Sequence, residues 1–174
     1  MDQQTSELLD ALQSAIDIED NGLTSYLKFA RKTNNETGKN MFIRLALDEF
    51  EHHLILEKQL MSMLNWRTSG NIEIPESKLV PIAPIVREKQ IQTKGEAQLS
   101  ELDALNTAAD MERKSGDFYR EHAEKADNQD VITLFKNLAE WEDNHLNLIQ
   151  SELDAINQTG HWFGIPEFYM DGKY

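Results

Sequence analysis

The amino-acid sequence predicts an all-α protein, an antiparallel four-helix bundle with one long crossover between its second and third helices. Apolar residues recur at helical spacing in four long segments, and short polar turns join the first segment to the second and the third to the fourth. A long connection with three prolines separates these two hairpins. With only 8 glycines and 4 prolines in 174 residues, the composition also favours helices.

Each expected helix carries one continuous apolar face. The helices are expected at about residues 5–31, 37–66, 96–126 and 130–158. The connection of residues 67–95 is long for a compact domain. A helix of about 28 residues is about 40 Å long, and an extended segment of this length can run beside it. We therefore expect a crossover along the bundle. Two hairpins on a flexible linker are disfavoured, because each would expose its apolar face.

The domain organisation follows from these elements. Residues 1–159 are expected to form one bundle of two hairpin repeats, at about residues 5–66 and 96–158. The tail of residues 160–174 is rich in aromatic side chains. Because such a tail is too apolar for a solvated end, we expect it to pack on the bundle or on a partner subunit.

Net charge and missing residue types exclude several functions. The formal net charge is −14, which disfavours binding to nucleic acid or to anionic membranes. There is no cysteine, which excludes disulfides, cysteine-ligated zinc and iron–sulfur centres. No stretch resembles a signal peptide or a membrane span, so we expect a cytoplasmic protein.

The two hairpins form an internal repeat. Shifting the sequence by 93 positions aligns residues 11–60 with residues 104–153 without gaps, and fifteen of the fifty pairs are identical. We expect the two halves to pack with approximate two-fold symmetry. The identical polar residues include, in each half, a glutamate, a tyrosine seven residues later, and then Glu-x-x-His. In chain order they are Glu19, Tyr26, Glu49 and His52, and then Glu112, Tyr119, Glu142 and His145.

The repeated glutamates and histidines lie on the apolar helix faces; Glu19, for example, shares a face with Leu12 and Leu23. Burying carboxylates without compensation costs on the order of several kcal/mol for each charge. Two divalent cations would neutralise four carboxylates, with neutral histidines completing the ligand set. One buried Glu-x-x-His is more often an ordinary polar pair, but two copies with matching upstream glutamates favour a di-metal site. The six expected metal ligands are Glu19, Glu49, His52, Glu112, Glu142 and His145.

Neighbouring polar residues are assigned other roles. Tyr26 and Tyr119 are expected to donate hydrogen bonds to ligand carboxylates, with an ordinary core tyrosine as the alternative. Asp48 and Glu51 are expected to point away from the bundle axis into solvent. The histidines outside the repeat are not expected to bind metal: His53, His122 and His161.

The chain resembles the rubrerythrin branch of the ferritin-like superfamily over most of its length. The resemblance rests on Glu19…Tyr26, Glu49-x-x-His52, Glu112…Tyr119 and Glu142-x-x-His145, and the tail from His161 to Phe168 is also similar to tails of rubrerythrin-like proteins. It implies a ferritin-like fold with two iron ions. By analogy, Glu19 and His52 would bind one ion, Glu112 and His145 would bind the other, and Glu49 and Glu142 would bridge them. Manganese, zinc or a mixed pair are the alternative metals.

Three departures from related families refine this expectation. Rubrerythrin peroxidases usually carry a cysteine-ligated rubredoxin domain, and since this sequence has no cysteine an external electron-donor protein is expected. They also carry a further glutamate one turn after the first on the third helix, where this chain has Ser115. Because this glutamate is missing, we do not expect the metal ion to move during turnover as it does in those peroxidases. Bacterioferritin binds haem through a methionine just after the second-helix glutamate; Phe50 takes this place here, so haem and a storage cage are not expected.

The resemblance implies a redox enzyme that reduces hydrogen peroxide or dioxygen, and by analogy a homodimer. Two other functions stay open. One is ferroxidation or iron transfer without peroxide turnover, which the acidic surface fits. The other is a non-enzymatic metal-bound bundle, for example with zinc, that binds a partner through its tail or long connection.

Overall fold

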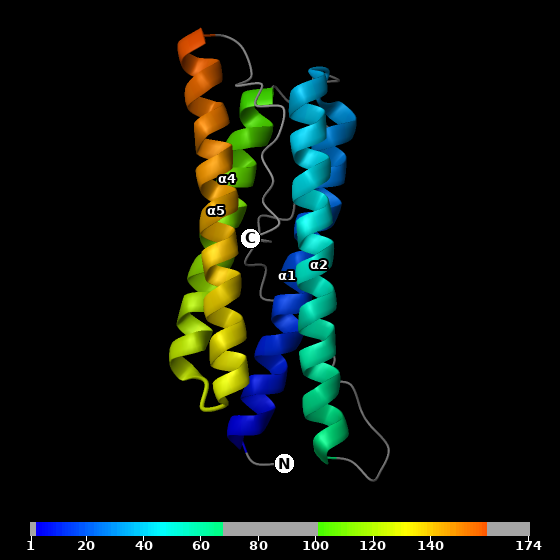
Figure 1. Ribbon diagram of the computed structural model, residues 1–174, viewed down its shortest axis with the longest axis vertical. Helices are drawn as coiled ribbons and strands as arrows, with labels where there is room; N and C mark the ends of the chain where they lie inside the picture. Colours follow the sequence, from blue (N-terminus) through cyan, green and yellow to red (C-terminus); the bar gives the residue numbers. More distant parts are fainter. Residues whose placement is uncertain (1–2, 68–100, 160–174) are drawn as a thin grey trace, which may run out of the picture.

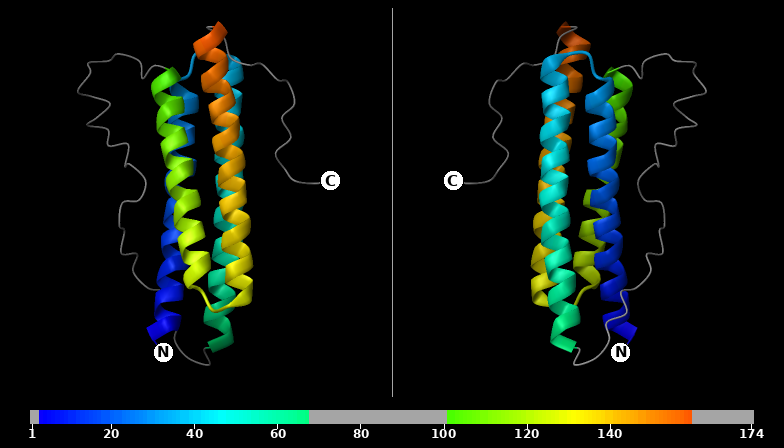
Figure 2. Two further views of the ribbon diagram at one scale, coloured as in Figure 1. Left: turned by 90° about the vertical axis from the view of Figure 1, so that its left-hand side faces the viewer. Right: turned by 90° about the vertical axis from the view of Figure 1, so that its right-hand side faces the viewer.

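A computed structural model describes residues 3–67 and 101–159, and within these ranges the fold consists of four α-helices. They are α1 (Gln3–Lys32), α2 (Glu36–Arg67), α4 (Glu101–Lys125) and α5 (Gln129–Thr159). The helices lie side by side in one long bundle (Figures 1 and 2). The expected helix boundaries are confirmed to within a few residues wherever they fall in the described ranges. The expected start of the third helix, near residue 96, falls outside them.

The helix directions confirm the ferritin-like topology. α1 and α2 run antiparallel, as do α4 and α5, and α2 ends at the lower end of the bundle whereas α4 begins at the upper end (Figure 1). Glu101, the first residue of α4, accepts hydrogen bonds from the backbone N–H groups of Asn34 and Asn35 at 3.2 and 3.0 Å. The start of α4 therefore lies beside the turn between α1 and α2. The connecting residues 68–100 and the tail 160–174 lie outside the described residues.

The internal repeat extends to the helix starts. At the start of α2, the side-chain oxygen of Asn35 accepts a hydrogen bond from the N–H of Gly38 at 3.1 Å. At the start of α5, the side-chain oxygen of Asn128 accepts hydrogen bonds from the N–H groups of Asp130 and Val131 at 3.0 and 3.1 Å. Asparagine is a favourable N-cap because it satisfies N–H groups that have no partner within the helix. Asn35 and Asn128 are equivalent positions of the repeat.

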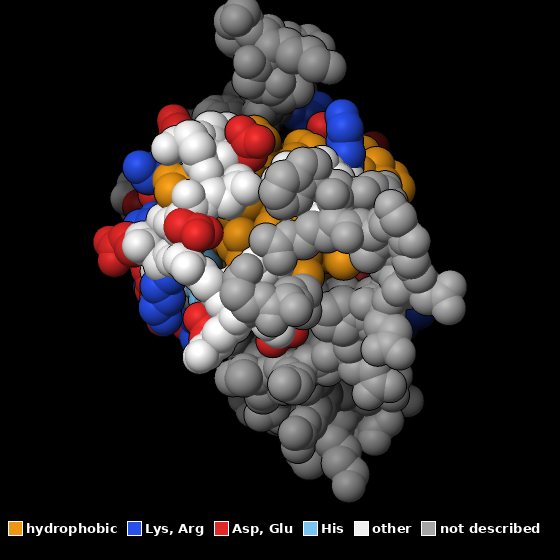
Figure 3. Space-filling model, turned by 90° about the horizontal axis from the view of Figure 1, so that it is seen from below, with side chains coloured by type: hydrophobic (Ala, Val, Ile, Leu, Met, Phe, Trp, Pro, Cys, Tyr) orange, Lys and Arg blue, Asp and Glu red, His pale blue; other side chains and the backbone are white. Residues whose placement is uncertain are grey.

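Within the described ranges, the core consists of two apolar clusters, a lower one and an upper one. The repeat relates them: Phe42 and Ile149 in the upper cluster are equivalent to Phe135 and Leu56 in the lower one, and all four side chains are fully buried. On the part of the lower face that the described residues form, hydrophobic side chains are visible toward the middle and charged side chains gather toward the edge (Figure 3). The repeated glutamates and histidines are placed between the two clusters.

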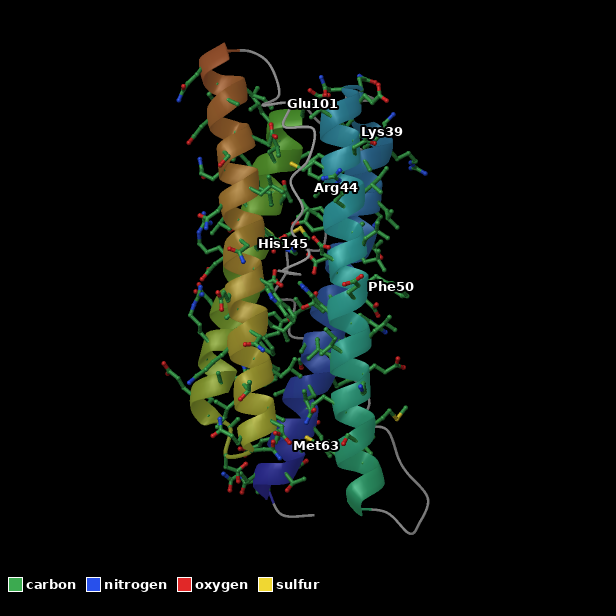
Figure 4. The ribbon with its side chains drawn as sticks, viewed as in Figure 1. Lys39, Arg44, Phe50, Met63, Glu101 and His145 are labelled. Atoms are coloured by element: carbon green, nitrogen blue, oxygen red, sulfur yellow. The ribbon has the colours of Figure 1, made fainter. Side chains whose placement is uncertain are left out.

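The outer face of α2 differs from that of α5. α2 exposes a row of large apolar side chains at helical spacing: Ile43, Leu47, Phe50, Leu54 and Met61. The equivalent residues on α5 are polar or charged: Lys136, Glu140, Asp143, Asn147 and Asp154. Figure 4 shows Phe50 on the outer side of α2. Despite this row, no helix in the described ranges has an apolar stretch long enough to cross a membrane.

Candidate metal centre

The six expected metal ligands meet near the middle of the bundle. α1 and α4 each contribute one glutamate, and α2 and α5 each contribute a Glu-x-x-His pair. All six side chains are buried, with exposed fractions from 1% to 6%. They form two groups, and within each group the candidate ligand atoms lie within 4.8 Å of one another. The groups are Glu19, Glu49, His52 and Glu142, and Glu49, Glu112, Glu142 and His145.

Two carboxylates belong to both groups. Glu49 on α2 and Glu142 on α5 are shared, whereas each remaining glutamate and histidine belongs to one group. A shared carboxylate between two cation positions is the geometry of a bridging ligand. The structure therefore brings the six residues together in the pairing that the family resemblance implied, and metal binding by them stays a prediction.

Both histidines turn the same ring nitrogen toward the centre. Nδ1 of His52 lies 3.3 Å from Oε2 of Glu19 and 3.5 Å from Oε2 of Glu49. Nδ1 of His145 lies 3.5 Å from Oε2 of Glu112. Figure 4 shows His145 near the middle of α5, on the side that faces α2. The opposite nitrogen, Nε2, is left to contact the surrounding protein, which is how metal-binding histidines are usually oriented by their neighbours.

Two buried tyrosines connect the hairpins at this centre. The Tyr26 hydroxyl on α1 donates a hydrogen bond to Glu112 on α4, and the Tyr119 hydroxyl on α4 donates one to Glu19 on α1. The expected hydrogen bonds to candidate ligand carboxylates are therefore present. Each phenol supports the upstream glutamate of the opposite hairpin, a detail that spacing within one helix could not predict.

Asp48 is a residue of the centre that the sequence analysis missed. The expectation that it points away from the axis into solvent is wrong, because its side chain is 29% exposed and its Oδ2 lies 3.4 Å from Nε2 of His145. Helical spacing places Asp48 at the edge of the apolar face of α2. α5 lies next to this edge and brings His145 to it. Glu51 is exposed, as expected.

Two further residues shape the centre without having been predicted. Trp141 stacks on His52, with ring centroids 4.9 Å apart and an interplanar angle of 13°. Gly22 faces Glu49, and a Cβ at this position would lie 3.0 Å from Cδ of Glu49. The lack of a side chain at Gly22 therefore leaves room for the carboxylate of Glu49. Trp141 occupies the repeat position equivalent to Asp48, and its contact with His52 depends on the packing of α5 against α2, which spacing within one helix does not show.

The other polar residues considered in the sequence analysis serve different contacts. Buried Ser115 donates a hydrogen bond to a backbone carbonyl of its own helix at 3.1 Å. Nδ1 of His53 lies 2.9 Å from Oδ1 of Asp20, and His122 packs on Phe118 with ring centroids 4.0 Å apart. Within the described residues none of these belongs to a candidate metal group. The tail histidine lies outside those residues.

Burial dominates the electrostatics of the centre. Burial raises the pKa of Glu112 to about 8, and burial together with neighbouring carboxylates raises the pKa of Glu49 and of Glu142 well above the usual range. Burial would also raise the pKa of Glu19, but hydrogen bonds with Glu49 and His52 lower it overall. Burial lowers the pKa of both histidines, and the surrounding carboxylates outweigh this and raise it. Without cations, the charged carboxylates are therefore costly.

Two buried atoms of the centre test whether cations fit. Oε1 of Glu142 and Nδ1 of His145 have no hydrogen-bond partner within the described part of the chain. Leaving buried polar atoms unpaired is costly, and both atoms belong to candidate metal groups. Cations among the carboxylates would pair with both atoms. Since four glutamates carry −4 and two divalent cations carry +4, the donor set fits two dications.

Comparison with known proteins agrees with this donor set. The family model for rubrerythrin matches residues 10–153, a range that contains all six candidate ligands and both tyrosines. The chain belongs to the rubrerythrin family. The matched range of this rubrerythrin-family chain is the ferritin-like di-iron domain.

A solved structure with a similar fold is "Hypothetical Protein Pfu-1136390-001" from Pyrococcus furiosus. It is 22% identical to this rubrerythrin-family chain, with a TM-score of 0.64 and coverage of 87% of this chain and 90% of that one. At this identity the likeness shows the fold alone. A comparison with curated proteins found no match.

Proposed function

We propose that this rubrerythrin-family chain is a non-haem di-iron oxidoreductase that reduces hydrogen peroxide or dioxygen. The observation that carries the proposal is the duplicated, buried ligand set in which Glu49 and Glu142 belong to both groups. Oxygen-rich ligation with imidazole suits iron or manganese, and iron is the metal that the family suggests. When bound, the two ions would supply redox and Lewis-acid chemistry.

The chain's own residues would hold and shield the reacting centre. Tyr26 and Tyr119 fix Glu112 and Glu19 by hydrogen bonds, which limits how far these carboxylates can shift. The apolar clusters above and below the centre exclude water, and this strengthens electrostatic interactions inside it. Because the sequence has no cysteine, we propose that electrons come from a separate donor protein.

Rapid-mixing spectroscopy tests this proposal. Protein loaded anaerobically with about two ferrous ions per chain is mixed with hydrogen peroxide or with dioxygen. We expect at least one of the two oxidants to oxidise the bound ferrous ions within the catalytic time. A chemical reductant should then restore the ferrous state. Glu49→Gln should abolish the signal. Glu51→Gln is the matched control, because Glu51 is exposed on the same helix. If wild-type protein binds ferrous iron but neither oxidant oxidises the bound ions, the proposal is contradicted.

Repeated additions of ferrous iron under air separate an enzyme from an iron-handling protein. A cofactor site should stop consuming iron near about two ions per chain. Continued uptake of many ions would instead indicate storage. Metal analysis of natively expressed protein adds a second distinction, since zinc, which is redox-silent, would indicate a structural site.

A further inference from the structure

The two histidines of the centre have different neighbours on their outer sides. Nε2 of His145 lies 3.4 Å from a carboxylate oxygen of Asp48. The His52 ring instead lies flat against the Trp141 indole, with centroids 4.9 Å apart. Asp48 is partly exposed, and His145 is buried. One histidine therefore faces a charged acceptor, and the other faces an aromatic surface.

A single position of the repeat causes this difference. Asp48 and Trp141 are 93 residues apart, and each directly precedes the glutamate of its Glu-x-x-His. Each also contacts the histidine of the opposite hairpin, on the neighbouring helix. The tyrosine hydrogen bonds, by contrast, are the same in both halves. The neighbour of the histidine thus distinguishes the two halves of an otherwise symmetric centre.

The two neighbours act differently on an imidazole. A carboxylate that accepts a hydrogen bond from Nε2–H fixes the tautomer whose Nδ1 lone pair faces the centre, and it makes that lone pair a stronger donor. An indole face offers packing and a π surface but no acceptor for Nε2–H. His145 should therefore bind a cation more strongly than His52 does, with the same nitrogen turned inward.

We propose that Asp48 is a positioning residue that makes the two metal positions unequal. The position of Glu112 and His145 binds a divalent cation more tightly than the position of Glu19 and His52. This inference rests on the proposed di-metal function and adds an order of loading to it. The tight position fills first, and the second ion completes the centre.

Titration of the metal-free protein with Co²⁺ tests the inference. Calorimetry and the visible absorption of bound Co²⁺ measure the binding. Wild-type protein should bind about two ions in two steps of unequal affinity. Asp48→Ala should weaken the tighter step by about tenfold or more, as removal of such outer partners does, and leave the other step unchanged. Asp48→Asn keeps an acceptor without its charge and should give an intermediate affinity. Glu51→Ala, which removes an exposed carboxylate from the same helix, is the matched control and should preserve both steps.

Two histidine variants assign the steps to their positions. His145→Ala should remove the tight step, and His52→Ala should remove the weak one. The reverse assignment, an unchanged tight step in Asp48→Ala, or two equal steps in wild-type protein would each overturn the inference and leave the proposed function standing. Wild-type protein that binds no Co²⁺ would overturn both. Circular dichroism of each metal-free variant checks folding; should Asp48→Ala fail to fold, the wild-type isotherm and the histidine variants still decide.

Discussion

Hairpin α1–α2 and hairpin α4–α5 present the same groups to the bundle axis, a glutamate, a tyrosine and a Glu-x-x-His pair, and yet they differ around these groups. Asp48 takes the place that Trp141 has in the other hairpin. Exposed Phe50 corresponds to Asp143, which pairs with Arg120 at 3.0 Å. A shared centre constrains the groups that face it, because four buried carboxylates need a common set of cations. Adjacent and outer positions carry no such constraint, so each half can acquire its own properties there.

The largest expected effect comes from removing either of the two shared carboxylates. Glu49→Ala and Glu142→Ala should each abolish stoichiometric metal binding at both positions, because each glutamate belongs to both groups. Equilibrium dialysis with metal analysis measures the ions retained per chain. If one of these variants retained both ions while the other lost them, the two halves would not share a bridged centre.

The pH dependence of stability tests whether the titratable groups that the two halves bury together have shifted pKa values in the metal-free protein. Folding raises the pKa of Glu112 from 4.5 to about 8, so over this range the folded metal-free protein keeps a proton that the unfolded chain releases. The contribution of Glu112 to the free energy of unfolding is fully present below pH 4.5 and is lost as the pH rises to about 8. The pKa values of Glu49, Glu142 and both histidines are shifted in the same direction. The Tm of metal-free protein should therefore fall between about pH 5 and pH 8.

Metal-loaded protein should show the opposite trend over the same pH range. Cations compete with protons for the ligands, so binding strengthens as the pH rises and stabilises the folded state. Differential scanning calorimetry of both forms in matched buffers makes the comparison. A metal-free Tm that rose over this range would contradict the assignment of these groups as buried and uncompensated.

The tyrosines offer a matched pair of smaller changes. Tyr26→Phe should weaken the position that contains Glu112, and Tyr119→Phe should weaken the position that contains Glu19. A hydrogen bond to a charged group contributes about 1.5 kcal/mol or more, so about a tenfold loss of affinity is expected at one position in each variant. Co²⁺ titrations measure both. If each variant instead weakened Co²⁺ binding at the metal position that contains the glutamate of its own hairpin, the crossed hydrogen bonds would be contradicted.

The smallest expected effect compares Gly22 with its equivalent in the other half, Ser115. A methyl group at position 22 would meet the Glu49 carboxylate at 3.0 Å, so Gly22→Ala should displace this carboxylate slightly and weaken metal binding by a few-fold. Ser115→Ala removes only a hydrogen bond to its own helix and should leave the affinity unchanged. Equal effects of the two variants would show that Gly22 has no special role beside Glu49.

Much of the fold was predictable because each helix signals itself through local spacing. The apolar faces, the short turns and the long connection were sufficient for the topology. The structure adds the N-cap residues Asn35 and Asn128, which fix the starts of α2 and α5 and were not predicted. The six candidate ligands were predictable because the repeat marks them twice. A single Glu-x-x-His would have carried far less information.

The parts of the centre that could not be predicted depend on contacts between helices. Asp48 appeared solvated when α2 was considered by itself, and it becomes a neighbour of His145 only because α5 packs against that side. The crossed tyrosine bonds and the stacking of Trp141 on His52 have the same origin. The homodimer expected from the family resemblance stays a prediction.

Anomalous diffraction from crystals of the iron-loaded protein tests the central claim most directly. Two iron peaks are expected inside the bundle, one between Glu19 and His52 and the other between Glu112 and His145. Glu49 and Glu142 should contact both ions. A centre that accepts no iron, or ions bound only outside these six side chains, would contradict the account.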